Sequence, residues 1–553
     1  MNKVWVVCRY FVSQFYSVST SRFSSYQPFF FALVLAFGVF IGVMLGPIMG
    51  SKPTPTQARS TYTRMDSILA YIDNRYVDSI NTDSLLDVMI TNYLNDPATI
   101  DSFFKFLDPH SNYIHKEDLQ GFNEDLEGNF DGIGIEFNIL NDTILVVTAL
   151  SGGPSEKLGI QSGDQIIRID DTLVAGIGVT NQQVMSMLRG KKGTVVEVDI
   201  KRRGENELIP FRITRDVIPV HSVDVAYMID DITGYIKVNK FSANTPYEFA
   251  DAVIKLNSRG MKQLILDLRS NPGGYLQGAV SLADQFIPGK ELIVYTEGRA
   301  VGRTEERSGK AGLFEQGKLI VLVNEGSASA SEILAGALQD NHRATIVGRR
   351  SFGKGLVQEV YPLPDTSAVR LTIARYYTPS GKSIQRSYAN GTDAYYDEYM
   401  QIVMNGDSDS VNGRKADWGI APDVEVALDT SDLSRRFNRL YNLGLVQQFS
   451  YGWYGNHKKQ MEGYTDVQAF QKDFHMSDEM FRSFLNYVSD KEPEQSLPAD
   501  TASLLRPRIE TGIMAVLARQ QWGNDGFFPI LNSMDPDIQA ALDAAYRKEE
   551  HKK

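Results

Sequence analysis

The sequence has a single cysteine, Cys8, among its 553 residues. One thiol excludes an intramolecular disulfide and any metal site built from several cysteines. The seven histidines are scattered, and neither an H-E-x-x-H motif nor paired C-x-x-C motifs occur, so the sequence predicts no metal and no other cofactor. The G-x-S-x-G motif of the α/β-hydrolases is also missing.

Acidic residues are absent before Asp66, and the only charged residues in the first fifty are Lys3, Arg9 and Arg22. The uncharged run that starts at Phe29 would reach about 33 Å as a helix, enough to cross a bilayer core. A cleaved signal peptide has a shorter apolar region and a small-residue cleavage site, so we favour an uncleaved anchor, although cleavage stays open.

The preceding basic residues orient this predicted anchor. By the positive-inside rule, residues 1–27 form a cytoplasmic tip and residues 28–50 a single span of the inner, cytoplasmic membrane. The remaining chain then lies on the periplasmic or extracytoplasmic side. It is acidic, since 68 Asp and Glu residues outnumber 56 Lys and Arg residues in the whole sequence. An acidic chain binds polyanions poorly, so we expect no nucleic-acid partner.

The pattern of residues after a polar linker divides the chain into four parts. Residues 61–125 have helical spacing in places, and residues 126–215 form short β-type runs separated by glycine, which indicates a small barrel-like domain. Over residues 216–426 strand-like and helix-like segments alternate, which predicts an α/β core with largely parallel strands. Residues 427–553 carry apolar stripes at helical spacing and predict a helical extension with its own core.

A serine-rich turn, Asn-Glu-Gly-Ser-Ala-Ser-Ala-Ser-Glu, ends at Glu332 and lies between a strand-like and a helix-like run. A serine at a helix N-terminus meets free N–H groups and the positive end of the helix dipole, which stabilise a developing oxyanion. Ser329 and Glu332 also have the spacing of a capping box, a purely structural device. The residues alone therefore leave a site and a cap both open.

A second turn, Arg-Ser-Asn-Pro-Gly-Gly, follows another strand-like run and ends at Gly274. Consecutive glycines allow backbone N–H groups to approach a ligand closely, as an oxyanion hole requires. Two such turns at strand ends of one α/β sheet predict a crevice. Ser351 to Lys354 also matches the S-x-x-K motif of penicillin-recognising enzymes, but the neighbouring glycines disfavour the helix that this motif needs.

These segments together resemble the carboxy-terminal processing peptidases, or tail-specific proteases, of serine peptidase family S41. The resemblance covers about residues 100–425 and is carried by the segments FDGIGIEF, GGPSEKLGIQSGDQIIRID, LRGKKGT, LILDLRSNPGG, NEGSASASEILAGALQDNHRA, SFGKGLVQ and RYYTPSGKSIQ. It implies an α/β catalytic core of the crotonase/ClpP-like kind with an inserted PDZ-like β domain. The acidic stretch 393–417 and the extension 427–553 depart from the family pattern.

The resemblance also implies the catalytic roles. Ser329 matches the nucleophile, Lys354 the general base, and Gln358 the residue that orients the lysine. Three positions match the oxyanion hole: Gly273, Gly274 and Ala330. Two side chains are candidates for supporting roles: Glu332 and Ser351. A lysine that acts as a base near pH 7 needs its pKa lowered by about 3 units, about 4 kcal/mol, which burial can supply.

The PDZ-like domain is expected to select the substrate. Gly132, Ile133 and Gly134 match the loop whose N–H groups bind a terminal carboxylate, and the strand edge that follows pairs with an extended peptide. Arg189, in the LRGKKG turn, is predicted to link this domain to the catalytic crevice.

The function implied is a membrane-anchored serine endopeptidase with Ser-Lys catalysis that cleaves envelope proteins with apolar C-terminal tails. Two alternatives stay open: a PDZ receptor that binds tails without cutting them, and an S-x-x-K penicillin-recognising hydrolase. The sequence also leaves open whether the chain forms a homo-oligomer or works with an adaptor.

Overall fold

The computed structural model describes residues 60–81, 84–86, 100–140, 142–150, 152–405, 410–411 and 414–547. The expected tip and membrane span, residues 1–50, lie outside these ranges. Among the described residues, no helix is both long and apolar enough to cross a membrane. Residues 64–553 form one compact unit, which carries all the described strands.

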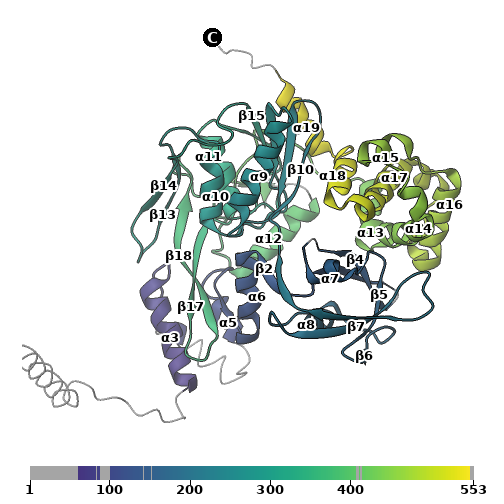
Figure 1. Ribbon diagram of the computed structural model, residues 1–553. Coiled ribbons are helices and arrows are strands. Elements are labelled where there is room, and N and C mark those ends of the chain that lie inside the picture. Colours follow the sequence, from purple (N-terminus) through teal and green to yellow (C-terminus); the bar gives the residue numbers. More distant parts are fainter. Residues whose placement is uncertain are drawn as a thin grey trace, which may run out of the picture. The chain divides into compact units, whose positions relative to one another are not determined.

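A six-stranded sheet forms the centre of the α/β core (Figure 1). Its strands, in sheet order, are β10 (Val223–Met228), β11 (Thr233–Val238), β12 (Gln263–Asp267), β15 (Lys318–Val323), β16 (Thr345–Gly348) and β21 (Val424–Glu425). All neighbours are parallel except β10 and β11, which are antiparallel. The predicted α/β core with largely parallel strands is therefore confirmed.

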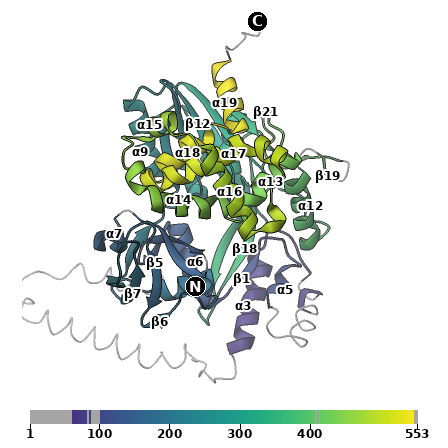
Figure 2. The same ribbon diagram turned by 90° about the vertical axis from the view of Figure 1, so that its right-hand side faces the viewer.

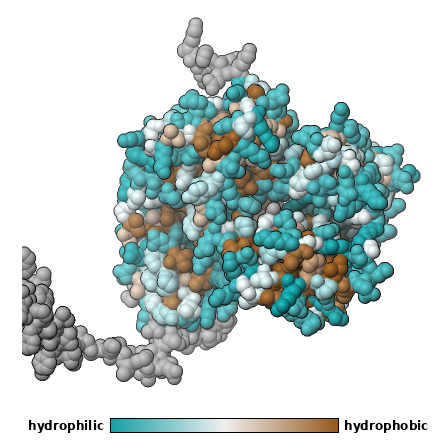
Figure 3. Space-filling view, in the orientation of Figure 1, coloured by the Kyte–Doolittle hydropathy of each residue, from teal (hydrophilic) through white to brown (hydrophobic). Residues whose placement is uncertain are grey.

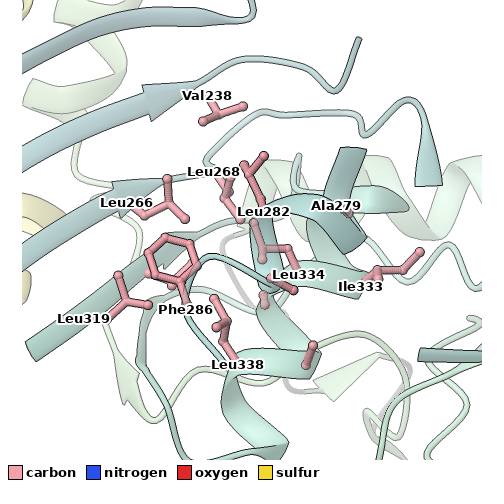
Figure 4. Close-up of a cluster of buried hydrophobic side chains, with 14 of the residues drawn as sticks. Val238, Leu266, Leu268, Ala279, Leu282, Phe286, Leu319, Ile333, Leu334 and Leu338 are labelled. Atoms are coloured by element: carbon pink, nitrogen blue, oxygen red, sulfur yellow. The ribbon is translucent and has the colours of Figure 1, made fainter. Parts of the chain in front are cut away.

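Helices cover both faces of this sheet, as its nearly continuous apolar strands require. One face packs against α9 (Thr245–Ser258), α10 (Leu276–Ala283) and α11 (Ala330–Asp340). Figure 4 shows Leu266 of β12 and Leu268, which follows that strand, in one cluster with Leu282 of α10 and Leu334 of α11. The other face is covered by α19 (Pro536–Tyr546), from which Ile538, Ala541 and Ala545 pack against β12 and β15.

A second, antiparallel sheet lies beside the first. Its path is β1 (Asn112–Ile114), β18 (Ala368–Tyr377), β13 (Leu292–Glu297) and β14 (Thr304–Arg307), and β17 (Leu356–Pro362) also pairs with β18. The strand-like run at residues 291–296, which the alternating pattern assigns to the core, therefore belongs to this sheet. An apolar run predicts a strand but not which partner it pairs with.

The β domain contains a five-stranded path of β3 (Ile135–Leu140), β4 (Thr143–Ala149), β5 (Gln165–Ile169), β7 (Val195–Lys201) and β8 (Ile209–Thr214), with β6 (Thr172–Leu173) on β5. Its helices are α7 (Pro154–Leu158) and α8 (Asn181–Leu188), and β2 (Asn129–Gly132) pairs with β9 (Asp216–Pro219). Helix α8 covers residues 181–188. It begins with a capping box between Thr180 and Gln183.

The remaining elements are mostly helical. The N-terminal region of helical spacing, called the lead-in below, contains α3 (Ser60–Arg75), α5 (Ile100–Phe104) and α6 (Lys116–Glu127). The acidic stretch 393–417 overlaps α12 (Thr392–Asn405) and contains the short strands β19 (Ser410–Val411) and β20 (Arg414–Lys415). The extension contains α13 (Asp432–Asn442), α14 (Leu445–Met461), α15 (Val467–Asp473), α16 (Asp478–Lys491), a 3-10 turn (Pro493–Gln495), α17 (Ala499–Trp522) and α18 (Asn524–Asn532).

These extension helices face the viewer in Figure 2 and have their own apolar core, as predicted.

Candidate active site

The two turns predicted to form a crevice lie side by side. They follow β12 and β15, which are parallel neighbours, so both turns leave the sheet at the same edge. The carbonyl oxygen of Asn271 accepts a hydrogen bond from the Ala328 N–H at 2.9 Å and another from Ser331 Oγ at 3.0 Å. These bonds tie the glycine-rich turn to the start of α11.

Gly273 makes the closest approach between the turns. A Cβ atom at Gly273 would lie 2.8 Å from Ser329 Cβ and 2.9 Å from the Ala330 nitrogen, and its φ is +97°. The Gly273 N–H donates to Asn271 Oδ1 at 2.9 Å. Within the described chain, the N–H groups of Gly274 and Ala330 donate to no acceptor. Of the three predicted oxyanion-hole positions, these two present free donors.

Ser329 stands at the N-terminus of α11 with φ +55° and ψ −113°, which is rare for a residue other than glycine. Such backbone strain persists only where surrounding contacts enforce it. The neighbouring Asn271 and Glu332 contacts supply this enforcement, because the Ser329 N–H donates to Glu332 Oε2 at 2.9 Å.

Glu332 joins the serine turn to the lysine loop. Besides the Ser329 N–H, its buried carboxylate accepts bonds from Ser351 Oγ at 2.5 Å, the Gly353 N–H at 2.7 Å and the Lys354 N–H at 2.9 Å. The same oxygen, Oε2, binds the backbone of both Ser329 and Lys354. Burial raises the pKa of Glu332, and these hydrogen bonds oppose that rise. Glu332 is therefore more than a helix cap.

Lys354 lies in the loop before β17, and Gln358 lies on that strand. Lys354 Nζ donates to Gln358 Oε1 at 3.1 Å, and Gln358 Nε2 donates to the carbonyl oxygen of His110 at 2.6 Å. The second bond fixes which end of the amide faces the lysine. Gln358 thus stands where the resemblance requires an orienting residue.

The surroundings of Lys354 favour its neutral form. The pKa of Lys354 is lowered to about 8, mainly by burial and also by nearby Arg370, while Asp108 and Glu332 oppose the change. Burial and the adjacent cations also lower the pKa of His110 to about 2, so this histidine adds no positive charge near neutral pH. The predicted pKa depression of the lysine is thus present, and burial is its main cause.

Sequence reasoning missed the role of Tyr376. This buried residue of β18 contacts the carbonyl oxygens of both Ser329, at 3.0 Å, and Lys354 through its hydroxyl group. It therefore fixes the backbone of both residues from the second sheet. Its only signal in the sequence was its place in a strand-like run.

Sequence reasoning also missed the roles of His110 and Asp108, which lie in one turn. Asp108 Oδ1 accepts the N–H groups of His110 and Ser111, each at 2.9 Å, which shapes the turn that presents the His110 carbonyl to Gln358. His110 is thus a turn residue whose carbonyl oxygen holds the amide of Gln358.

Ser351 does not form the pair that the S-x-x-K alternative needs. Residues 351–355 are not helical, and the Ser351 hydroxyl donates to Glu332 and accepts from the Ile420 N–H at 2.7 Å. Its contacts are those of a residue that supports the loop. The structure therefore lacks the arrangement required of a penicillin-recognising site.

The predicted peptide-carboxylate loop precedes β3 in the β domain. The carbonyl oxygen of Ile133 accepts a bond from Ser155 Oγ at 2.7 Å, and Gly134 has a φ of +74°. Arg189 pairs with Glu124 of α6 at 3.3 Å, and its guanidinium lies over the Phe130 ring. Arg189 therefore links the β domain to the lead-in helix rather than directly to Ser329 or Lys354.

The helical extension reaches the crevice turns through two arginines. Arg269, which precedes the glycine pair, binds Asp535 at 2.8 Å and Asp537 at 2.9 Å at the start of α19. Arg349 also pairs with Asp537, at 3.3 Å, and with Glu325 in the serine turn, at 2.9 Å. This contact gives the extension a structural connection to the site that the sequence pattern did not indicate.

Comparisons with known proteins match three parts of this chain. The model of peptidase family S41 matches residues 232–393, a PDZ-domain model matches residues 132–211, and a family of unknown function matches residues 436–523. A carboxy-terminal-processing protease of Bartonella bacilliformis is 37% identical over 356 residues, 63% of this chain and 78% of that protein.

Two further proteins are similar to this chain. The carboxy-terminal processing protease CtpA of Bacillus subtilis is 33% identical over 346 residues, 61% of this chain and 70% of that protein. A solved photosystem II D1 C-terminal processing protease is 26% identical, with 67% of this chain and 94% of that chain covered and a TM-score of 0.39.

Proposed function

Because this chain belongs to the carboxy-terminal processing proteases of peptidase family S41 and has a PDZ domain, we propose that Ser329 is its nucleophile and Lys354 its general base. The observation that carries the proposal is the shared carboxylate oxygen of Glu332, which binds the backbone N–H groups of both residues at 2.9 Å. Two residues fixed to one atom keep their relative position during the reaction.

The chemistry follows from the protonation state of the lysine. Neutral Lys354 accepts the proton of the Ser329 hydroxyl as the oxygen attacks the scissile carbonyl carbon. The resulting ammonium group then gives its proton to the leaving amine. Gln358 accepts a hydrogen bond from the lysine without adding a negative charge that would raise its pKa.

The developing oxyanion needs donors that are not already used. The free N–H groups of Ala330 and Gly274 suit this role, and Ala330 is also the first residue of α11, at the positive end of its dipole. The Gly273 N–H is occupied by Asn271, so Gly273 contributes its small size and backbone shape. This assignment supports a two-donor oxyanion hole.

The PDZ domain selects substrates by their C-termini in this proposal. The loop at residues 132–134 binds the terminal carboxylate, and β3, an edge strand of its sheet, pairs with the peptide. Apolar side chains gather at the surface of this domain, brown at the lower right of Figure 3, and Met185 of α8 is 41% exposed. An apolar tail would cover such side chains.

The basic, acid-free N-terminal sequence supports attachment to the inner membrane through residues 28–50. The catalytic body then works on the extracytoplasmic side, where its substrates are envelope proteins. A single anchor of this kind keeps the protease close to proteins that are exported through the same membrane.

The test of this function compares two substrates that differ only in their tails. The full chain in detergent is given an unfolded protein that ends in an apolar tail, or the same protein with two terminal aspartates. We expect cleavage of the apolar-tailed protein to be about tenfold faster, which corresponds to about 1.4 kcal/mol of tail recognition. Mass spectrometry of the products identifies the cut.

The Ser329→Ala chain is the control, and it should bind the apolar tail without cutting. Cleavage that persists in this variant would refute the assignment of the nucleophile. Binding without cleavage by the unchanged chain would favour the receptor alternative instead.

The lowered pKa of Lys354 also predicts a pH profile. Below about pH 8 the lysine is protonated and cannot act as a base, so kcat/KM should rise about tenfold per pH unit and level off above that value. Because Arg370 helps to lower this pKa, Arg370→Gln should move the midpoint to higher pH. If the midpoint of the kcat/KM profile lay near pH 6 and did not change in Arg370→Gln, another group would be the base.

A further inference from the structure

A cavity of about 370 Å³ lies between the PDZ domain and the helical extension, outside the catalytic crevice. One wall comes from the end of β3 and the start of α8, and the other from α13, α14 and the turn between them. The lining residues that matter here are Asn138, Leu140, Asn181, Leu443, Gln447 and Tyr451.

The proposed tail-binding groove starts at the carboxylate loop of residues 132–134 and follows α8 and β3. The cavity lies at the far end of this groove. Asn181 and Met185 lie four residues apart and share a face of α8, and Arg189 follows directly after the end of this helix. The Arg189 end adjoins the carboxylate loop, since a Cβ atom at Gly132 would lie 3.9 Å from the Arg189 Cα atom. The Asn181 end lines the cavity.

Strand β3 also leads from the carboxylate loop to the cavity. It begins directly after the carboxylate loop and ends at Leu140, which lines the cavity. A peptide that pairs antiparallel with this edge has its carboxylate at the loop and its earlier residues toward the cavity. At about 3.3 Å per extended residue, the cavity begins roughly four to six residues before the C-terminus.

The lining is polar without charge. Asparagine, glutamine and tyrosine side chains dominate it, and no lining residue is ionisable at neutral pH. The side-chain oxygen of Gln447 is buried and accepts no hydrogen bond within the described chain, whereas that of Gln448 accepts one from Tyr487 at 2.9 Å. A buried acceptor without a donor is costly, and a rotation of the Gln447 side chain, which lines the cavity, would let a peptide N–H group satisfy it.

We propose that this cavity is a second substrate subsite, which binds an uncharged segment of the tail about five to eight residues before the C-terminus. The inference rests on the proposed tail recognition by the PDZ domain and extends it. It gives the helical extension a part in substrate selection, because the groove binds the terminal residues and the extension contacts the residues before them.

The experiment measures peptide binding to the full-length Ser329→Ala chain by fluorescence anisotropy. One peptide has five apolar residues. Two others carry six additional residues upstream, either serine, glutamine and tyrosine, or aspartate and glutamate. We expect the uncharged eleven-residue peptide to bind about tenfold more tightly than the short one, and the acidic peptide to show no gain.

A matched pair of variants separates the subsite from the groove. Gln447→Leu preserves the size of the side chain and should remove most of the gain while the short peptide binds as before. Gln471→Leu changes an exposed glutamine of α15 and should alter neither affinity. Leu443→Glu, which places a charge at the exposed edge of the cavity, should also abolish the gain.

Equal affinities for the short and the uncharged long peptide would overturn the proposal. So would a gain that survives in both Gln447→Leu and Leu443→Glu, or a loss in Gln447→Leu that is the same for both peptides, which would mark Gln447 as a structural brace. If none of the three peptides binds, the proposed tail recognition by the PDZ domain is refuted.

Discussion

Replacement of Lys354 by methionine is expected to reduce kcat about 10³-fold, because a positioned general base contributes about 10² to 10⁴ to the rate. Methionine fills a similar volume in the buried site but cannot accept the Ser329 proton. The loss should appear in kcat rather than in the affinity for the tail, since the peptide groove lies in another domain. Steady-state cleavage and tail-peptide binding measure the two separately.

The stability of this variant distinguishes lost chemistry from misfolding. The pKa of Lys354 is lowered from 10.5 to about 8, so its charged form costs about 3 kcal/mol in the folded state below pH 8. That cost disappears as pH rises from 8 to 10.5, because the unfolded chain then binds more protons. Lys354→Met should therefore be at least as stable as the parent at pH 7.

Lys318→Met is the matched control. Lys318 begins β15 at the end opposite the serine turn, and its Nζ donates to the carbonyl oxygen of Arg547. Its replacement should leave kcat within about twofold. If Lys354→Met kept more than a tenth of the parent's activity while folded, Lys354 would not be the base.

The parts of the site that the sequence predicted are local. Ser329, Gly273 and Gly274 stand in turns directly after strands, where the composition of the turn and the adjacent periodicity reveal both structure and chemistry. Lys354 and Gln358 were supplied by the family resemblance, since nothing in their own spacing distinguishes a base from a loop lysine. The helices of the extension were predicted from apolar stripes alone.

The parts that were missed depend on contacts between distant segments. Gln358 is oriented by a carbonyl 248 positions away, and Tyr376 acts through backbone groups of two separate turns. A carbonyl oxygen has no signature in a sequence. For the same reason no sequence pattern indicated that α19 covers the central sheet or that Asp535 and Asp537 bind Arg269.

Gly273→Ala tests the crevice without removing any functional group. The added Cβ atom would lie 2.8 Å from both Ser329 Cβ and the Ala328 carbonyl oxygen, and 2.9 Å from the Ala330 nitrogen. Backbone atoms cannot move aside as a flexible side chain can, so the serine turn and the oxyanion donor must shift. Loss of one such donor costs about 10² to 10³ in kcat, and we expect a loss of that size.

The result depends on separating the clash from backbone strain. Alanine at a φ of +97° costs about 1 to 2 kcal/mol wherever it occurs. Gly289→Ala carries the same kind of strain, since Gly289 has a φ of +85°, but nothing lies within 4 Å of its added Cβ atom. Both variants should therefore lose thermal stability, Gly273→Ala at least as much as Gly289→Ala, while only Gly273→Ala loses proteolysis and keeps tail binding. Equal activity in the two variants would mean that the glycine turn does not form the crevice, because the predicted overlap with Ser329 and Ala330 is the one property that Gly289 lacks.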